Sequence, residues 1–76
     1  MKIKVYTAPG CPYCFAVKEF LQERGIQFEE IDVSQNEEAL IYIIEKTQQY
    51  GVPVIEIDGE FIIGFDRERL IQILSK

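Results

Sequence analysis

The chain has 76 residues, of which 47% are hydrophobic and 28% charged, and its formal net charge is −5 at pH 7. We therefore expect one small domain over residues 1–76, with no room for a second core, and an acidic surface that disfavours nucleic acid and anionic membranes. Because no apolar run approaches the roughly 20 residues of a membrane span and no signal peptide is apparent, we expect a cytoplasmic protein.

The N-terminal third predicts a strand, a helix and a second strand. Apolar and polar residues alternate over residues 2–7, which indicates a strand. From Pro12 to about Arg24 the apolar positions recur at helical spacing, and Gly25 ends the helix. Residues 28–33 predict the second strand. Because crossovers of this kind are right-handed, the two strands should pair in parallel.

A second helix should follow. Ser34 and Glu37 have the spacing of a capping box, which favours a helix start at this point. The helix should end near Gln49, with Tyr50 and Gly51 as the exit.

The C-terminal part predicts a hairpin and a last helix. Asp58-Gly59, between apolar residues 54–57 and 61–63, is a strong hairpin signal, and Asp66 is a good N-cap for the helix. The order is βαβαββα, and helices on both faces of a four-stranded sheet are the compact arrangement. Six positions should face the core: Val5, Leu21, Ile31, Ile43, Ile57 and Leu70.

The two cysteines of the chain, Cys11 and Cys14, are separated by two residues. On a first helical turn their Cβ atoms would lie roughly 5 to 6 Å apart, close enough for small adjustments to permit a disulfide. The ring would be small, so its contribution to stability through loop entropy should be modest. This favours a reversible redox couple over a structural crosslink.

The helix that begins at Pro12 gives a reason for reactivity. Its free N–H groups and partial positive charge stabilise a thiolate at Cys11. Our hypothesis is that Cys11 attacks a substrate disulfide and that Cys14 resolves the mixed disulfide. Half of a zinc or iron–sulfur site is the other interpretation. A tetrahedral zinc site needs four ligands, and this chain offers two thiolates, no histidine and otherwise carboxylates.

Three segments resemble the glutaredoxins, and most closely the short bacterial glutaredoxin-like redoxins. They are Cys11-Pro12-Tyr13-Cys14 after the first strand, Val52-Pro53 before the hairpin and Ile63-Gly64-Phe65-Asp66 before the last helix. The resemblance implies the thioredoxin fold, with a four-stranded mixed sheet flanked by three helices. It also implies that Pro53 is a cis proline beside the cysteines, and that the backbone of Val52 pairs with a peptide or with glutathione.

The resemblance further implies a substrate or glutathione groove. Tyr13 should line it, although it could instead pack locally, and Pro53 could merely start an exposed strand. Asp66 could be a glutathione ligand or only an N-cap. Phe65 is expected in the core. The expected groove consists of Tyr13, Val52, Pro53, Gly64 and Asp66.

Several positions depart from the glutathione-dependent pattern. Ala8 occupies the place of a lysine usual in those proteins, Gly51 that of a threonine, and Ile63-Gly64 that of a glycine pair. Arg67 replaces an aspartate, and we expect it to be a solvated first-turn residue rather than a ligand of a glutathione carboxylate. These changes make thioredoxin reductase an alternative source of electrons.

The sequence thus predicts a glutaredoxin-type thiol–disulfide oxidoreductase that reduces protein disulfides or glutathione mixed disulfides. We expect a monomer with no bound metal or organic cofactor, with glutathione as co-substrate or thioredoxin reductase as donor, and with disulfide-containing client proteins. A reductase-fed, thioredoxin-like donor with weak glutathione use is the first alternative. Others are a dimer that holds an iron–sulfur cluster or zinc through Cys11 and external thiols, and a peptide-binding adaptor without turnover.

Overall fold

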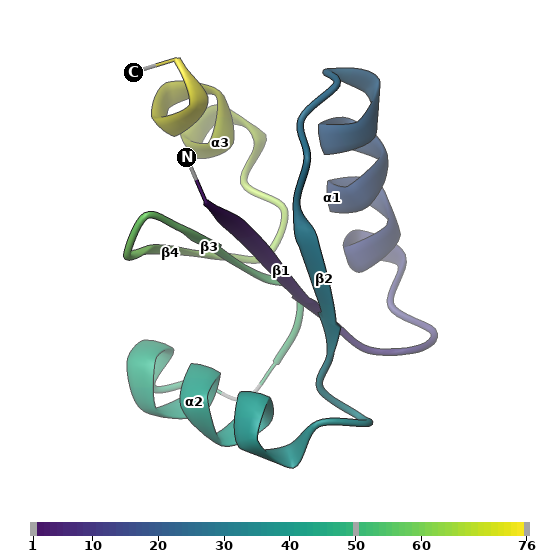
Figure 1. The fold of residues 1–76 in the computed structure, drawn as a ribbon, viewed down its shortest axis with the longest axis vertical. Coiled ribbons are helices and arrows are strands. Elements are labelled where there is room, and N and C mark those ends of the chain that lie inside the picture. The colour runs from purple at the N-terminus through teal and green to yellow at the C-terminus, as the bar shows by residue number, and fades with distance from the viewer. Residues whose placement is uncertain (1, 50, 76) are drawn as a thin grey trace.

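A computed structural model describes residues 2–49 and 51–75 of the chain (Figure 1). The order βαβαββα is confirmed, with element bounds close to those predicted. The strands and helices are β1 (Ile3–Thr7), α1 (Pro12–Glu23), β2 (Glu29–Asp32), α2 (Glu37–Thr47), β3 (Val54–Ile57), β4 (Glu60–Ile63) and α3 (Arg67–Leu74).

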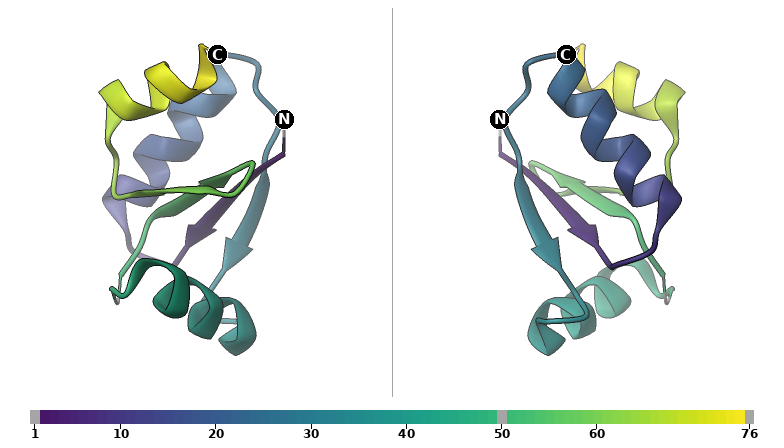
Figure 2. Two further views of the ribbon diagram at one scale, coloured as in Figure 1. Left: turned by 90° about the vertical axis from the view of Figure 1, so that its left-hand side faces the viewer. Right: turned by 90° about the vertical axis from the view of Figure 1, so that its right-hand side faces the viewer.

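The strands form one mixed sheet in the order β2-β1-β3-β4. As predicted, β1 and β2 are parallel, while β3 is antiparallel to both β1 and β4. Helices α1 and α3 cover one face of the sheet and α2 covers the other (Figures 1 and 2). Both central strands therefore lie between two layers of helix.

The alternation of side chains along the strands builds a core on each face of the sheet. The core under α1 and α3 consists of Ile3, Val5, Val17, Phe20, Leu21, Ile55, Ile57, Ile62, Leu70 and Ile73. The core under α2 consists of Tyr6, Val33, Ile43 and Val54.

Five of the six expected core residues are buried, and the sixth is Ile31. It is only partly buried because it lies on the edge strand β2, where it packs against the core under α2. Phe65 belongs to the other core, as expected. Its ring packs against that core and meets Phe20 edge to face, with the centroids 5.9 Å apart.

The expected capping box at Ser34 is wrong. The N-cap of α2 is Asn36, whose side-chain oxygen accepts a hydrogen bond from the Ala39 N–H at 3.0 Å. The backbone N–H and hydroxyl of Ser34 instead donate to Asp32 Oδ1, at 2.9 and 2.6 Å. Asp32 thus holds Ser34 in a turn, and the helix begins further along. At the other end, α2 stops at Thr47, and the expected exit residue Tyr50 lies outside the described residues.

The hairpin between β3 and β4 confirms the Asp58-Gly59 signal. Both residues have positive φ, 49° for Asp58 and 89° for Gly59, as a type I′ turn requires. Asp66 is the N-cap of α3, also as expected, and its side chain accepts a hydrogen bond from the Arg69 N–H. None of the described helices is long and apolar enough to cross a membrane.

Candidate active site

Cys11 occupies the N-cap of α1, where the chain leaves the carboxyl end of β1. Its backbone is extended, and Pro12 is the first residue of the helix, where no N–H is needed. The Cys14 N–H donates to the Cys11 sulfur at 3.1 Å. Cys11 is partly exposed. The N-terminus of α1 thus directs a hydrogen-bond donor at an accessible sulfur.

Cys14 lies one turn further along and is only 2% exposed. Burial, followed by the hydrogen bond with Cys11 and the charge of Cys11, raises the pKa of the Cys14 thiol to about 11, whereas a backbone hydrogen bond with Ala8 and the charge of Lys18 act to lower it. The two sulfurs therefore have different surroundings. Cys14 stays protonated while Cys11 is reduced. Once Cys11 is in a disulfide, its thiol no longer raises the pKa of Cys14.

The segment before β3 lies against the cysteines. The Val52–Pro53 peptide bond is cis, which confirms that expectation, and Pro53 is fully buried. The Cys11 thiol lies 3.8 Å from the Val52 carbonyl oxygen, to which it donates. The Gly64 N–H donates to the Pro53 carbonyl at 2.8 Å. The structure thus brings Cys11, Val52, Pro53 and Gly64 together from three parts of the chain.

Two further residues, Tyr13 and Asp66, were expected in the groove. Tyr13 is 64% exposed on the first turn of α1, so its ring is free of the core. The Asp66 Oδ1 accepts the Arg69 N–H at 3.1 Å and so caps α3. Arg67 is exposed, and its guanidinium lies 6.0 Å from the centroid of the Phe20 ring. The glutathione-binding roles of Tyr13 and Asp66 stay predictions.

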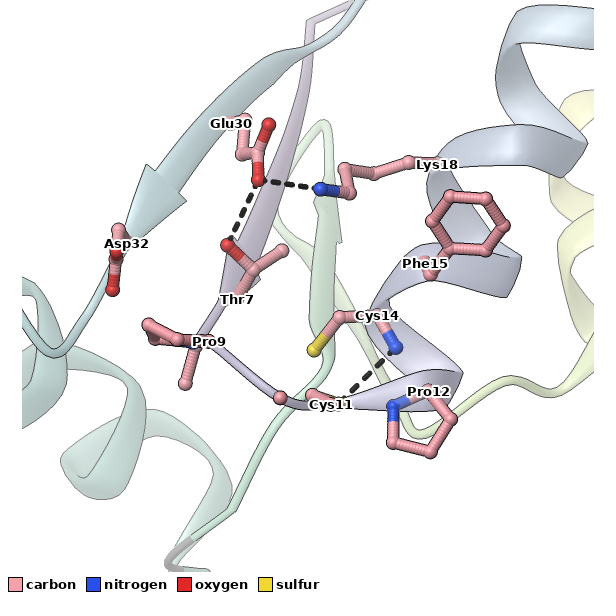
Figure 3. A pocket seen from close by; sticks show the side chains of 11 residues that line it. Thr7, Pro9, Cys11, Pro12, Cys14, Phe15, Lys18, Glu30 and Asp32 are labelled. Atoms are coloured by element: carbon pink, nitrogen blue, oxygen red, sulfur yellow. Dashed lines mark hydrogen bonds and ion pairs between the residues drawn. The ribbon is translucent and has the colours of Figure 1, made fainter.

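A pocket of about 560 Å³ opens beside the cysteines on the side of β2 (Figure 3). In it the Lys18 ammonium forms an ion pair with Glu30 Oε2 at 2.9 Å. The buried Thr7 hydroxyl donates to the same oxygen at 3.1 Å. The pocket is lined by Thr7, Ala8, Pro9, Gly10, Cys11, Pro12, Cys14, Phe15, Lys18, Glu30 and Asp32.

The polar members of this pocket were not among the expected site residues. Glu29 and Glu30 have the pattern of solvated charges at a strand end, yet Glu30 is paired. The sequence held one sign that Lys18 belongs to the site: it follows Cys14 by four residues, and residues four apart on a helix lie on the same face. A pairing across to β2 could be found only once the register of the parallel strands was known.

In residues 2–49 and 51–75, no group of three or more histidine, cysteine, aspartate or glutamate side chains is placed to hold a metal ion. The two cysteines could still contribute to a metal site completed from outside the chain. The iron–sulfur and zinc alternatives therefore require external thiols or a second copy.

A Cys-x-x-Cys pair at a helix N-terminus, opposite a cis proline that precedes an antiparallel strand, defines a thioredoxin-fold protein of the redoxin class. The Glutaredoxin family model matches residues 3–62. An uncharacterized glutaredoxin-like 8.6 kDa protein in the rubredoxin operon of Clostridium pasteurianum is 35% identical over 97% of this chain and 99% of its own. The chain belongs to the glutaredoxin family.

Solved structures support the same fold. A mutant of the thioredoxin-like protein BC3987 is 40% identical, with a TM-score of 0.91 over 97% of this chain and 95% of its own. The glutaredoxin-like protein NrdH-redoxin from Escherichia coli is 31% identical, with a TM-score of 0.82 over 97% of this chain and 95% of its own. The expected thioredoxin fold is thereby confirmed.

Proposed function

We propose that the protein is a thiol–disulfide oxidoreductase in which Cys11 is the nucleophile and Cys14 the resolving thiol. The observation that carries this proposal is the asymmetry of the pair. Cys11 is partly exposed and receives the Cys14 N–H at 3.1 Å, whereas Cys14 is buried and its pKa is raised. An accessible thiolate and a protected thiol are what two successive exchange steps need.

The chemistry takes two exchanges. The Cys11 thiolate attacks one sulfur of a client disulfide, and the other client sulfur leaves as a thiolate and takes up a proton. Cys14 then loses its proton and attacks the Cys11 sulfur, which breaks the mixed disulfide and releases the second client thiol. The client gains two electrons and two protons, and the Cys11–Cys14 disulfide must be reduced again by two thiols from a donor.

The client is held, in this proposal, by the segment before β3. The Val52 backbone lies beside the Cys11 sulfur and offers an extended peptide one more antiparallel partner. Pro53 and Gly64 shape the floor, and Tyr13 and Asp66 contact the client or glutathione at the margins. The peptide-binding adaptor uses the same edge without electron transfer, so loss of activity in a cysteine variant separates the two functions.

A second candidate, a reductase-fed redoxin with weak glutathione use, is favoured by the placement of cations. Lys18, the cation that lines the cysteine pocket, is already paired with Glu30, and Ala8 brings no charge. A glutathione carboxylate that reached this pocket would have to compete with Glu30 for Lys18. The Escherichia coli NrdH-redoxin, in the words used for its structure, has a thioredoxin-like activity profile.

The test supplies each source of electrons separately. Turnover of a glutathione mixed disulfide is measured with glutathione and glutathione reductase, and insulin reduction with NADPH and thioredoxin reductase. Activity in the first system identifies a glutathione-dependent enzyme, and activity in the second alone identifies a reductase-fed redoxin. Inactivity in both, with a folded protein and commercial enzymes shown to work, would contradict the proposed function. The Cys11→Ser variant is the matched blank.

A further inference from the structure

A charged network lies in the pocket that the resolving cysteine, Cys14, also lines. Lys18 is on α1, Glu30 is on β2 and Thr7 is the last residue of β1, and Glu30 Oε2 joins the other two. The Lys18 side chain is 28% exposed and the Thr7 residue 3%. Figure 3 shows the Lys18 ammonium and the Thr7 hydroxyl meeting at Glu30, on the wall of the pocket that also contains the Cys14 sulfur.

The helix places Lys18 close to Cys14. The two residues are four apart on α1, so they lie on one helix face with Cβ atoms roughly 5 to 6 Å apart. A free lysine side chain would extend into solvent, but the pairing across to β2 draws the ammonium over the pocket. The positive charge is therefore held in the pocket that Cys14 also lines, in a partly buried site where solvent screens it less than on an open surface.

We propose that Lys18 sets the rate of resolution by stabilising the Cys14 thiolate, and that Glu30 and Thr7 are positioning residues that hold the Lys18 ammonium over the pocket. This inference rests on the proposed function, because it concerns the second exchange. Resolution requires that Cys14 gives its proton to solvent in the pocket. Its thiolate then attacks the Cys11 sulfur, and the client sulfur leaves and is protonated.

Other charged groups near Cys14 do not provide the same stabilisation. Asp32 on β2 also lines the pocket, but its Oδ1 accepts two hydrogen bonds from Ser34. Cys11 acts to raise the pKa of Cys14, and the backbone of Ala8 acts to lower it, as does Lys18. The pocket-lining residues of β1 and the loop after it, 7–10, carry no charge. Lys18 is thus the cation that lines this pocket.

The experiment uses one turnover with an aromatic disulfide that releases a coloured thiol at each step. The first release reports attack by Cys11 and depends on reagent concentration. The second reports resolution by Cys14 and does not. We expect Lys18→Gln to leave the first release intact and to slow the second about threefold at neutral pH. A rise of one pKa unit removes about nine-tenths of the thiolate, and the more basic sulfur recovers about half of that loss on a logarithmic scale.

Glu30→Gln should have the opposite effect on the second release. Glutamine retains an acceptor for Lys18 and Thr7 but removes the negative charge, so the ammonium acts on Cys14 unopposed and resolution is faster, by about twofold to threefold. If Lys18 and Glu30 had only a structural role, both variants would instead show slower resolution or lower stability. Lys46→Gln, on α2 beside Tyr42, is the matched control because it makes the same charge change away from the pocket.

A second measurement follows the Cys14 Cβ chemical shift by NMR against pH in the Cys11→Ser background. Lys18→Gln should raise the pKa of Cys14 and Glu30→Gln should lower it, with Lys46→Gln unchanged. The inference is overturned if both pocket variants move the rate or the pKa in the same direction, or if neither moves them while the first release proceeds normally. Absence of the first release in the wild-type protein would contradict the proposed function itself.

Discussion

The two faces of the sheet each hold a carboxylate above the strands, and the two carboxylates have different partners. On the α1 face, Glu30 pairs with the Lys18 ammonium and the Thr7 hydroxyl, and its side chain is 44% exposed. On the α2 face, both oxygens of Glu56 accept phenol hydrogen bonds, from Tyr6 at 2.8 Å and from Tyr42 at 3.1 Å.

This difference indicates that Glu30 tunes the chemistry of the site, whereas Glu56 has a structural role. Glu30 is solvent-exposed and paired with the Lys18 ammonium in the pocket that Cys14 also lines, so replacing it changes the electric field there. Glu56 is held by two neutral donors, one of them on the buried Tyr6, and it does not line the cysteine pocket. A partly buried carboxylate that accepts a phenol hydrogen bond at each oxygen should stabilise the packing of α2 on the sheet. We therefore expect the chemistry on one face and stability on the other.

The largest expected effect is on the α1 face, at the cysteines. Cys11→Ser should abolish turnover of every disulfide substrate, a loss of at least about a thousandfold, because a hydroxyl is not ionised at neutral pH. Cys14→Ser should leave the first attack intact and trap the mixed disulfide between Cys11 and the client. Mass spectrometry of the trapped species and insulin reduction measure the two outcomes.

Rapid alkylation of Cys14 in the wild-type protein, ahead of Cys11, would reverse these roles. Thermal melts provide the control. Because neither cysteine is in a disulfide in this structure, both serine variants should stay folded. An adaptor without turnover would keep its peptide affinity in the double serine variant, whereas the oxidoreductase would lose only its chemistry.

The next effect is on stability and belongs to the α2 face. Glu56→Ala leaves the buried Tyr6 hydroxyl without its acceptor, which should cost about 1 to 3 kcal/mol of unfolding free energy. In a domain of this size each kcal/mol lowers the melting temperature by roughly 4 to 8 °C. The rate of the second exchange should be unchanged. Glu45→Ala, at an exposed position on α2, is the matched control.

If Glu56→Ala were as stable as the wild-type protein, the phenol hydrogen bonds would be of no structural consequence. If it slowed resolution without loss of stability, the two faces would be coupled and the separation of roles would be wrong. Calorimetry and the two-step thiol release answer both questions on the same samples.

Local patterns were sufficient to predict most of the fold. Asp58-Gly59 determines its own turn, and the helical spacing of Val17 and Leu21 requires a covering sheet, so both predictions depend on residues close together in the sequence. The position of Cys11 at the N-cap is equally local. The predicted start of α2 was wrong because Ser34 and Asn36 are both residues that can cap a helix. Asp32, at the end of β2, favours a turn at Ser34, and the capping-box pattern does not reveal this turn.

The polar networks on both faces could not be predicted in this way. The partners in the pairs Lys18–Glu30 and Tyr6–Glu56 are 12 and 50 residues apart, and they meet only through the register of β1 with β2 and with β3. An acidic residue on a strand has the same sequence pattern whether it is solvated, ion-paired or clamped by tyrosines. The partners of Glu30 and Glu56 are determined by the tertiary structure, which is why the polar residues of the pocket that Cys14 lines were missed.

The smallest expected effect is a loss of unfolding free energy at alkaline pH, which compares the two faces of the sheet. Burial, followed by the hydrogen bond to Glu56, raises the pKa of Tyr6 above its ordinary value of 10.0. Above about pH 10 the folded state therefore keeps a proton on Tyr6 that the unfolded state has lost. The contribution of Tyr6 to stability is complete below about pH 10 and is lost as the pH rises through the pKa of the folded state. The slope is at most about 1.4 kcal/mol per pH unit for one proton.

Cys14 should act in the same direction from a lower pH, because burial raises its pKa from 9.0 to about 11. Urea denaturation across alkaline pH separates the faces: Cys14→Ser should flatten the decline between about pH 9 and 11, and Tyr6→Phe the decline above about pH 10. Tyr13→Phe, which removes a 64% exposed phenol outside this network, is the matched control. Identical slopes in all four proteins would show that neither proton is linked to folding, and the stabilising role of the Tyr6–Glu56 contact would then have to rest on packing alone.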